Sequence, residues 1–409
     1  MWLYNLGISL YAGGIRLAAL WHGKARLWSE GRRNIFERME AAVRPSDRIV
    51  WVHAASLGEF EQARPIIERL RAEHPEYKIL LTFFSPSGYE IRKNYEGADY
   101  VFYLPADTPS NARRFLDIVH PEIAIFIKYE FWINLLSELR RRKVRSYIVS
   151  AIFRRNSVFF RPYGAMWRQA LETFDTLFVQ NVESKRLLSE IGFDNVVVAG
   201  DTRFDRVAQI AAAAQRVETI ERFRGGGRLF VAGSTWGPDE EILLPLVNAN
   251  PDVKFVIAPH EMDEGRIAHL MRNAKGGAVR YTQCDAATRF DDVQVLVLDT
   301  MGMLSSVYGS ATWAYVGGGF GGGIHNTLEA ATFGLPIAFG PNYGKFKEAR
   351  DMVSLGCAVS VRTAGELAAW FAPLCDDEET LRRASRTAKD YTARNQGATG
   401  IILRSIFNS

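Results

Sequence analysis

Short apolar segments of β-strand character recur along almost the whole chain and alternate with stretches of helical pattern. Seven of them lie between Asp47 and Asp201, and seven more lie between Arg228 and Arg362. Strands that alternate with helices in this way are typical of parallel, doubly wound sheets. The pattern predicts an α/β fold with two Rossmann-like domains facing a cleft. Ligands of such sheets bind beyond the carboxyl ends of the strands.

A break between the two series falls within residues 206–227, where an alanine-rich helical stretch ends in Arg-Gly-Gly-Gly. A chain of 409 residues is long enough for two domains with separate cores. We therefore predict an N-terminal segment at 1–30, a first Rossmann-like domain at 31–205 that binds the acceptor, and a second at 206–409. The second domain would bind the nucleotide and include the C-terminal helices.

Cysteine usage and charge exclude two classes of site. The three cysteines form no CxxC pair, which argues for a reducing compartment and against a structural zinc site. Residues 1–38 carry six cationic side chains and two carboxylates, so they account for the whole net charge of +4. The rest of the chain is neutral overall. A basic groove for nucleic acid is therefore not expected.

The first 21 residues form an apolar run of about one bilayer's length. Arg16 and three glycines interrupt it, while its Trp and Tyr residues favour a membrane interface and the cations that follow favour anionic headgroups. We expect a membrane-associated helix on the cytoplasmic side. The alternative is an amphipathic first helix that packs on the protein body. A cleaved signal peptide is disfavoured, because no small-residue cleavage site follows the apolar run.

The segment Gly317–Pro341, GGGFGGGIHNTLEAATFGLPIAFGP, combines a glycine-rich turn with the start of a helix. Such a turn lets backbone approach a ligand, and the free N–H groups of a helix start bind anions. Glu329 would repel a lone phosphate but can accept hydrogen bonds from ribose hydroxyls. We infer a nucleotide or nucleotide-sugar site. The alternative is a turn whose glycines only allow close packing of helix and sheet.

Polar residues also follow strands of the first domain. Glu59 opens a helix after the first strand, Glu130 follows the fourth, and Arg203 follows the seventh. Together they suggest a set for proton transfer and charge stabilisation, with Glu59 as candidate general base. Each also has a structural alternative, since Glu59 could be a carboxylate favoured by the helix dipole and Glu130 could pair with Lys128.

In the second domain, Gly233 and Ser234 follow a strand and could donate N–H and hydroxyl groups to a phosphate. His260 ends the next strand after Pro259, although a lone histidine there is more often structural. The segment Met301–Met303 opens another helix, and methionine on a helix usually belongs to the core.

Taken in order, the motifs resemble one family over essentially the whole chain: the 3-deoxy-D-manno-octulosonic acid (Kdo) transferases of lipopolysaccharide assembly, which have the two-domain GT-B glycosyltransferase fold. The resemblance is most specific in HAASLGE and in the stretch from the glycines to HNTLEA. The other matching motifs are KYEFWINL, GDTRFD, IAPHE, DTMGMLSSVYGSA and GPNYGKFKEA.

The resemblance implies roles for the candidate residues. Glu59 would deprotonate the acceptor hydroxyl, and Glu130 and Arg203 would stabilise the transition state. The chain departs from the commoner family pattern at Lys128, Tyr129, His260 and Met303. Gly233 and Ser234, inferred above as a phosphate-binding pair, would lie in the same nucleotide site. The resemblance implies that CMP is bound by Pro259, His260, Met301, Gly302, Met303, Asn326, Thr327, Leu328 and Glu329.

The implied reaction is inverting transfer of Kdo from CMP-Kdo to the lipid A precursor, lipid IVA, at the cytoplasmic face of the bacterial inner membrane. Inner-membrane lipids would be further partners. No metal cofactor is expected, because no DxD-like cluster stands at a strand end. Two alternatives remain: a GT-B enzyme that uses another nucleotide-sugar, and a non-catalytic membrane protein that binds nucleotide-sugars. Two acids beside an anionic donor argue against the second.

Overall fold

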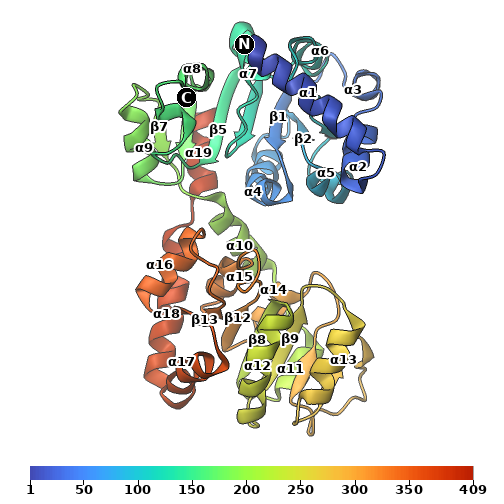
Figure 1. Cartoon of the computed structure of the whole chain (residues 1–409). Helices are drawn as coiled ribbons and strands as arrows, with labels where there is room; N and C mark the ends of the chain where they lie inside the picture. Colours follow the sequence, from blue (N-terminus) through green and yellow to red (C-terminus); the bar gives the residue numbers. More distant parts are fainter. Residues whose placement is uncertain (409) are drawn as a thin grey trace. The chain divides into compact units, whose positions relative to one another are not determined.

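The computed structural model describes residues 1–408, which form two compact units. Unit 1 comprises Met1–Arg206 together with the chain from Gln396 onward, and unit 2 comprises Val207–Asn395. Figure 1 shows the elements of each unit. Each unit is built around its own parallel sheet, as the alternating pattern predicted.

The sheet of unit 1 has seven parallel strands in the order β3-β2-β1-β4-β5-β6-β7. All seven strands predicted for this region are present. They are continuous apolar runs because both faces of the sheet are covered by helices. The strands are β1 Ile49–Ala54, β2 Lys78–Phe83, β3 Tyr100–Tyr103, β4 Ile123–Ile127, β5 Arg145–Ala151, β6 Thr176–Val179 and β7 Val196–Val198.

Helices pack on both faces of this sheet and enclose two hydrophobic cores. One core contains Trp51, Phe115 and Phe126, and the other contains Phe60 and Ile67. The helices are α1 Trp2–Ala18, α2 Gly23–Gly31, α3 Ile35–Ala42, α4 Leu57–Glu73, α5 Pro86–Arg92, α6 Pro109–Val119, α7 Ile133–Arg142, α8 Ala165–Leu171, α9 Val182–Ser189, α10 Thr202–Ala213, which continues into unit 2, and α19 Ala398–Phe407.

The N-terminal helix α1 is attached to unit 1 along one side. The Tyr4 hydroxyl donates to Asp107 Oδ2 at 2.6 Å, and the Tyr11 ring stacks on Phe84. Its other side leaves large apolar residues exposed, including Leu10 and Leu17. The helix is therefore packed on the body and still presents an apolar surface. Within residues 1–408, no helix combines the length and the apolar character needed to cross a bilayer.

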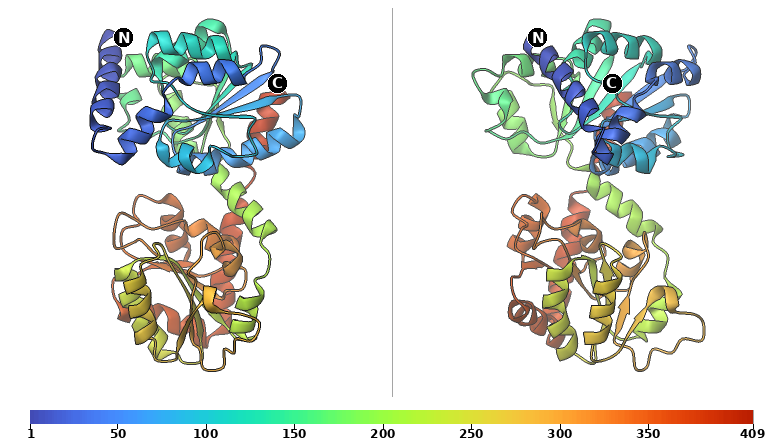
Figure 2. Two further views of the ribbon diagram at one scale, coloured as in Figure 1. Left: turned by 90° about the vertical axis from the view of Figure 1, so that its right-hand side faces the viewer. Right: turned by 45° about the vertical axis from the view of Figure 1, so that its right-hand side comes forward.

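The C-terminal helix α19 corrects the predicted domain division, which assigned 206–409 to the second domain. Figure 2 shows this red helix among the blue and green elements of unit 1. Ile402 and Ile406 are fully buried in the core that contains Phe60, and both oxygens of Asp205 accept hydrogen bonds from the turn before α19 and its first residues. The sequence shows that α19 is apolar, but its partner surface is set only by tertiary packing.

Unit 2 repeats the architecture with seven parallel strands in the order β10-β11-β9-β8-β12-β13-β14. All seven predicted strands are again present. The strands are β8 Leu229–Thr235, β9 Lys254–Pro259, β10 Ala278–Arg280, β11 Val295–Val297, β12 Trp313–Val316, β13 Ile337–Phe339 and β14 Ala358–Ser360. The helices are α11 Glu218–Arg224, α12 Gly237–Ala249, α13 Glu264–Asn273, α14 Leu304–Tyr308, α15 Thr327–Thr332, α16 Lys347–Leu355, α17 Ala364–Asp376 and α18 Glu378–Arg394.

Candidate active site

Unusual backbone conformations mark the carboxyl ends of three strands. Lys128, Ser150 and Ser234 have φ of 62°, 54° and 55° at or just after the ends of β4, β5 and β8. Residues other than glycine are uncommon in this left-handed region, and they cluster at ligand-binding and catalytic sites. The candidate residues lie at these same sheet edges.

Glu59 lies in the first turn of α4, directly after β1. Its carboxylate accepts a hydrogen bond from the Ser56 hydroxyl at Oε2. Within residues 1–408 its other oxygen, Oε1, has no hydrogen-bond or salt-bridge partner. Glu59 is half-buried, so part of the residue is open to solvent. The position fits both a carboxylate favoured by the helix dipole and a base, and the two roles are compatible.

Glu130 is held by two donors from unit 1. Trp132 Nε1 donates to its Oε2 at 2.7 Å, and His53 Nε2 lies 3.0 Å from the same oxygen. His53 is fully buried, and its Nδ1 lies 2.8 Å from the Thr82 hydroxyl, which itself accepts from Trp51 Nε1. A bare Nε2 would place its lone pair against the carboxylate, so Nε2 carries the proton that faces Glu130. His53 Nδ1 also lies 3.2 Å from the carbonyl oxygen of Thr82, and Trp132 Nε1 lies 3.2 Å from Nε2.

Arg203 lies in the first turn of α10 and forms an ion pair with Asp201 at 2.8 Å. Asp201 is buried and also accepts from Gln62 Nε2 at 2.8 Å. Burial tends to raise the pKa of Asp201, but the charge and hydrogen bonds of Arg203 bring it below its usual value. Because Gln62 belongs to α4, this network ties the turn that carries Arg203 to the helix that carries Glu59.

Several of these charged side chains act on the hydroxyl of one residue, Tyr129. Burial raises the pKa of its hydroxyl, Asp201 and Glu59 raise it further, and Arg154 and Arg203 oppose them. Glu59 and Arg203 therefore share an electrostatic neighbourhood beside Tyr129, the residue that precedes Glu130. The supporting residues His53, Gln62, Asp201 and Trp132 were not predicted as site residues, although each lies in or next to a motif that was.

The glycine-rich turn of unit 2 packs mainly against its own protein backbone. A Cβ on Gly317 would lie 2.2 Å from Ser234 O, and one on Gly319 would lie 2.6 Å from the Gly340 backbone. Gly318 has φ of 89° and donates its N–H to the buried Asp239 at 2.9 Å. A Cβ added at Gly322 would have no other atom within 4 Å. Close internal packing thus explains the first glycines, and the later ones border a cavity of about 470 Å³.

Three aromatic rings form a stack at the edge of that cavity. His260 stacks on Trp236 at 4.9 Å and on His325 at 4.3 Å between ring centroids. Trp236 Nε1 donates to His325 Nε2 at 3.2 Å. Burial and the neighbouring His260 lower the pKa of His325, which favours the neutral ring that this hydrogen bond requires. His260 is exposed on its remaining surface. Trp236 and His325 line the cavity and were not among the residues predicted from the sequence.

The remaining candidate residues of unit 2 lie after β9, β11 and β12. Asn326 caps α15 and donates to Glu329 Oε1 at 3.0 Å, and Ser305 donates to Glu329 Oε2 at 2.8 Å. The side chains of Thr327 and Leu328 are buried. Met301 is 78% exposed and precedes α14, and Met303 packs against the core. Within residues 1–408, no cluster of three or more His, Cys, Asp or Glu side chains could hold a metal ion.

Comparison with solved structures defines the class of fold. UDP-GlcNAc 2-epimerase of Neisseria meningitidis superposes with a TM-score of 0.62 at 15% identity, covering 88% of this chain and 100% of that one. MurG of Acinetobacter baumannii superposes with a TM-score of 0.55 at 13% identity, covering 89% and 100%. The protein therefore has the GT-B fold of two Rossmann-like domains.

Sequence comparison then gives the family. Residues 32–206 match the family model described as 3-Deoxy-D-manno-octulosonic-acid transferase (kdotransferase). The protein of Bordetella pertussis named 3-deoxy-D-manno-octulosonic acid transferase is 28% identical to this chain, and the alignment covers 87% of this chain and 86% of that protein. The protein of the same name from Haemophilus influenzae is 25% identical, and the alignment covers 88% of this chain and 86% of that protein. The chain is thus similar to this family of glycosyltransferases over most of its length.

Proposed function

We propose that this protein transfers Kdo from CMP-Kdo to a hydroxyl of the lipid A precursor, as a step of lipopolysaccharide core biosynthesis. The observation that carries the proposal is the arrangement in unit 1, where Glu59 in the first turn of α4 lies near Tyr129 and Arg203, in a chain similar to this family. A base with an accessible oxygen beside a cation suits transfer to a hydroxyl group.

In the proposed step, the acceptor oxygen attacks the anomeric carbon of Kdo while Glu59 Oε1 removes the hydroxyl proton. The new carbon–oxygen bond forms as the bond between that carbon and the CMP phosphate oxygen breaks, and the electron pair leaves with CMP. Attack from the face opposite CMP inverts the configuration. Arg203 and the fixed Glu130 stabilise the charges that develop.

Unit 2 is the proposed donor site. Phosphate oxygens of CMP would meet backbone N–H groups at the start of α15 and near Ser234, and Glu329 would accept from the ribose. The exposed edges of His260 and Met301 would contact the nucleotide. No metal is needed in this scheme, because the leaving phosphate charge is met by protein donors.

The lipid acceptor accounts for the exposed apolar side of α1. Leu6, Leu10 and Leu17 on α1, and Leu20 and Trp21 just after it, are each at least 48% exposed, which favours contact with acyl chains at the cytoplasmic face of the bacterial inner membrane. The proposed partners are thus CMP-Kdo, the lipid A precursor and membrane lipids.

The test is release of CMP from CMP-Kdo by the full chain, with and without a tetraacyl disaccharide bisphosphate acceptor. Glu59→Gln should lower acceptor-dependent turnover by about 100-fold or more while CMP binding stays intact, because general base catalysis contributes on that scale. Glu73→Gln is the matched control, since it removes an exposed carboxylate from the other end of α4. It should stay within about twofold of wild type.

Near-normal turnover by a folded Glu59→Gln variant would show that the base is wrongly assigned. CMP binding without release would favour a non-catalytic nucleotide-sugar-binding protein or a different acceptor. Stronger competition by UDP than by CMP would favour a GT-B enzyme that uses another nucleotide-sugar.

A further inference from the structure

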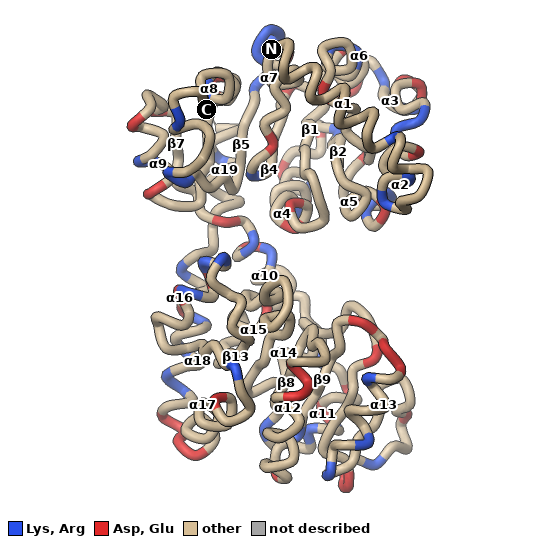
Figure 3. Tube along the Cα trace, viewed as in Figure 1, with Lys and Arg blue, Asp and Glu red and all other residues tan. Residues whose placement is uncertain are grey.

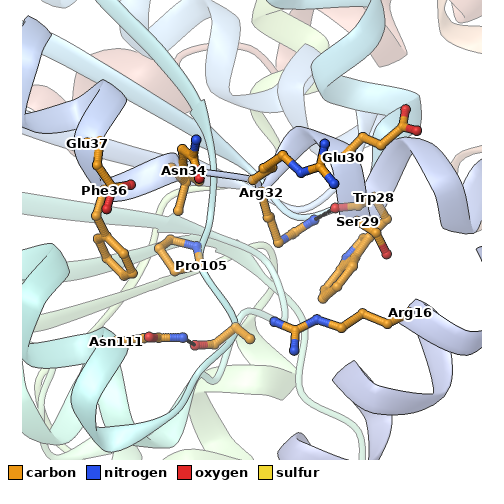
Figure 4. A pocket seen from close by; sticks show the side chains of 13 residues that line it. Arg16, Trp28, Ser29, Glu30, Arg32, Asn34, Phe36, Glu37, Pro105 and Asn111 are labelled. Atoms are coloured by element: carbon orange, nitrogen blue, oxygen red, sulfur yellow. Dashed lines mark hydrogen bonds between the residues drawn. The ribbon is translucent and has the colours of Figure 1, made fainter.

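Unit 1 contains a cavity of about 530 Å³ that the proposed reaction does not use (Figure 4). It is enclosed by the end of α1, the α2–α3 segment and the loop after β3. Figure 4 shows the Arg16 guanidinium extending across the cavity toward Asn111, while the Glu30 carboxylate points away from Arg16 and Arg32. Figure 3 shows the basic residues that gather along α2 and α3.

Arg32 is a largely buried cation in the wall of this cavity. Its guanidinium donates to Leu104 O and Phe84 O at 2.8 Å and to Trp28 O at 3.1 Å, and it lies 3.9 Å above the Trp28 ring. These partners are all neutral. Within residues 1–408 no carboxylate forms a salt bridge with Arg32, and burial lowers its pKa to about 9. A buried charge without a counter-ion is costly, so the position favours a bound anion.

Further polar groups of the cavity wall are unpaired. Ser29 Oγ and Trp28 Nε1 are buried and have no hydrogen-bond partner, and Trp28 is only 5% exposed. Arg16, on the last turn of α1, adds an exposed cation from the opposite side. Arg33 also lines the cavity, so three arginines face two carboxylates there, those of Glu30 and Glu37. Guanidinium groups match phosphate oxygens with paired N–H donors, so this excess of arginines suits a phosphate group.

The cavity adjoins the proposed catalytic region through two aromatic rings. The Arg32 guanidinium lies 5.1 Å from the Phe84 ring, and the Phe84 ring lies 4.6 Å from the Trp132 ring. Trp132 in turn donates to Glu130. The loop after β3 and the residue Glu130 after β4 also share one edge of a parallel sheet, because carboxyl ends of parallel strands meet at the same edge.

We propose that this cavity binds a phosphate monoester of the lipid acceptor, with Arg32 and Arg16 as its cationic partners. The inference rests on the proposed transfer to a phosphorylated glycolipid. A lipid-borne phosphate fits better than free phosphate, because the exposed apolar side chains Leu17, Leu20 and Leu27 lie close to Arg16 along the chain and can meet acyl chains.

The test compares Arg16→Met with Arg26→Met, which removes an equal charge from an exposed residue outside the cavity. The acceptors are the bisphosphate and its two monophosphate analogues. Arg16→Met should raise the acceptor KM about tenfold while kcat and the KM for CMP-Kdo stay unchanged, since a charged hydrogen bond is worth about that factor. The penalty should vanish on the analogue that lacks the bound phosphate.

Arg26→Met should stay within twofold of wild type. Equal penalties in both variants would mean that general surface charge attracts the acceptor, and a penalty that persists on both monophosphates would mean that Arg16 contacts something other than phosphate. Either outcome overturns the proposal.

A second readout does not depend on transfer. Inorganic phosphate, compared with chloride at equal ionic strength, should raise the thermal midpoint of wild type and of Arg26→Met more than that of Arg16→Met. This result supports the phosphate site even if no transfer is detected. Failure of the proposed reaction can therefore be told apart from failure of the phosphate site. Equal shifts in all three proteins overturn the site. A phosphate shift that depends on Arg16, without any effect on the acceptor KM, overturns the assignment to the lipid and leaves free phosphate as the ligand.

Discussion

At the scale of single residues, the carboxylate of Glu130 is fixed from the interior of unit 1. Its Oε2 receives hydrogen bonds from Trp132 and His53, and the buried Thr82 contacts the other ring nitrogen of His53. The printed contacts of the Glu130 side chain are all made through this one oxygen, and the side chain is 12% exposed. His53 is therefore a positioning residue for Glu130.

Replacement of His53 tests this role. His53→Leu should lower kcat about tenfold or more with little change in either KM, because Glu130 loses a charged hydrogen bond. His53→Gln should recover part of the loss, since its amide can donate to the same oxygen. In ¹⁵N NMR spectra of wild type, Nε2 of His53 should carry a proton. Equal kcat losses in the two variants would indicate only damaged packing.

The sequence predicted Glu59, Glu130 and Arg203 because a position at a strand end follows from the strand itself. It could not predict that His53 contacts Glu130. That contact depends on the pairing of β1 with β4, in which His53 lies opposite Phe126. Register between strands that are distant in the sequence is decided by packing of the whole sheet.

At the scale of elements, α1 is held on unit 1 by few polar contacts. The Tyr4 hydroxyl donates to the buried Asp107, which also accepts from the backbone N–H groups of Asn134 and Leu135 at the start of α7. Burial raises the pKa of Asp107, so its negative charge depends on these donors.

Tyr4→Phe should therefore lower the free energy of unfolding of unit 1 by about 1–3 kcal/mol, the usual cost of removing a hydrogen bond to a buried charged group. Urea unfolding would measure the change, and hydrogen exchange should show faster opening of α1. Tyr163→Phe is the control, because Tyr163 is 76% exposed. An unchanged midpoint for Tyr4→Phe would mean that the apolar contacts alone hold α1.

The glycine-rich turn shows what sequence patterns leave open. Its residue types suit close approach to a ligand, and the same residue types suit close approach to Ser234 and Gly340 within the protein. The two uses become distinguishable only when the neighbouring backbone is placed. The sequence was enough to locate the turn. The structure was needed to show which of its glycines pack against protein backbone and which border the cavity.

At the scale of the whole molecule, unit 1 is completed by a helix that follows unit 2 in the sequence. The predicted boundary near residue 206 lies where the structure divides the units, but α19 returns to unit 1. Ile402 and Ile406 are fully buried there. The two chain segments that connect the units are joined by hydrogen bonds of Asp205 to Gly397 and Thr399.

Ile402→Ala should destabilise unit 1 by about 2–5 kcal/mol, the usual cost of such a cavity. Hydrogen exchange should accelerate in β1 and α4 and stay unchanged in the strands of unit 2. Ser405→Ala, in the same helix, should have little effect. Equal acceleration in both units would mean that they unfold as one cooperative body.

The return of α19 also sets an order of events during synthesis. Unit 2 is translated between the two parts of unit 1, which at about 5–20 residues per second takes on the order of 10 to 40 s. Throughout that interval the nascent first unit lacks the helix that covers one of its cores, and α1 has already emerged with its apolar side chains. A ribosome that stops early therefore releases a chain with an uncovered core, which proteases and chaperones can recognise.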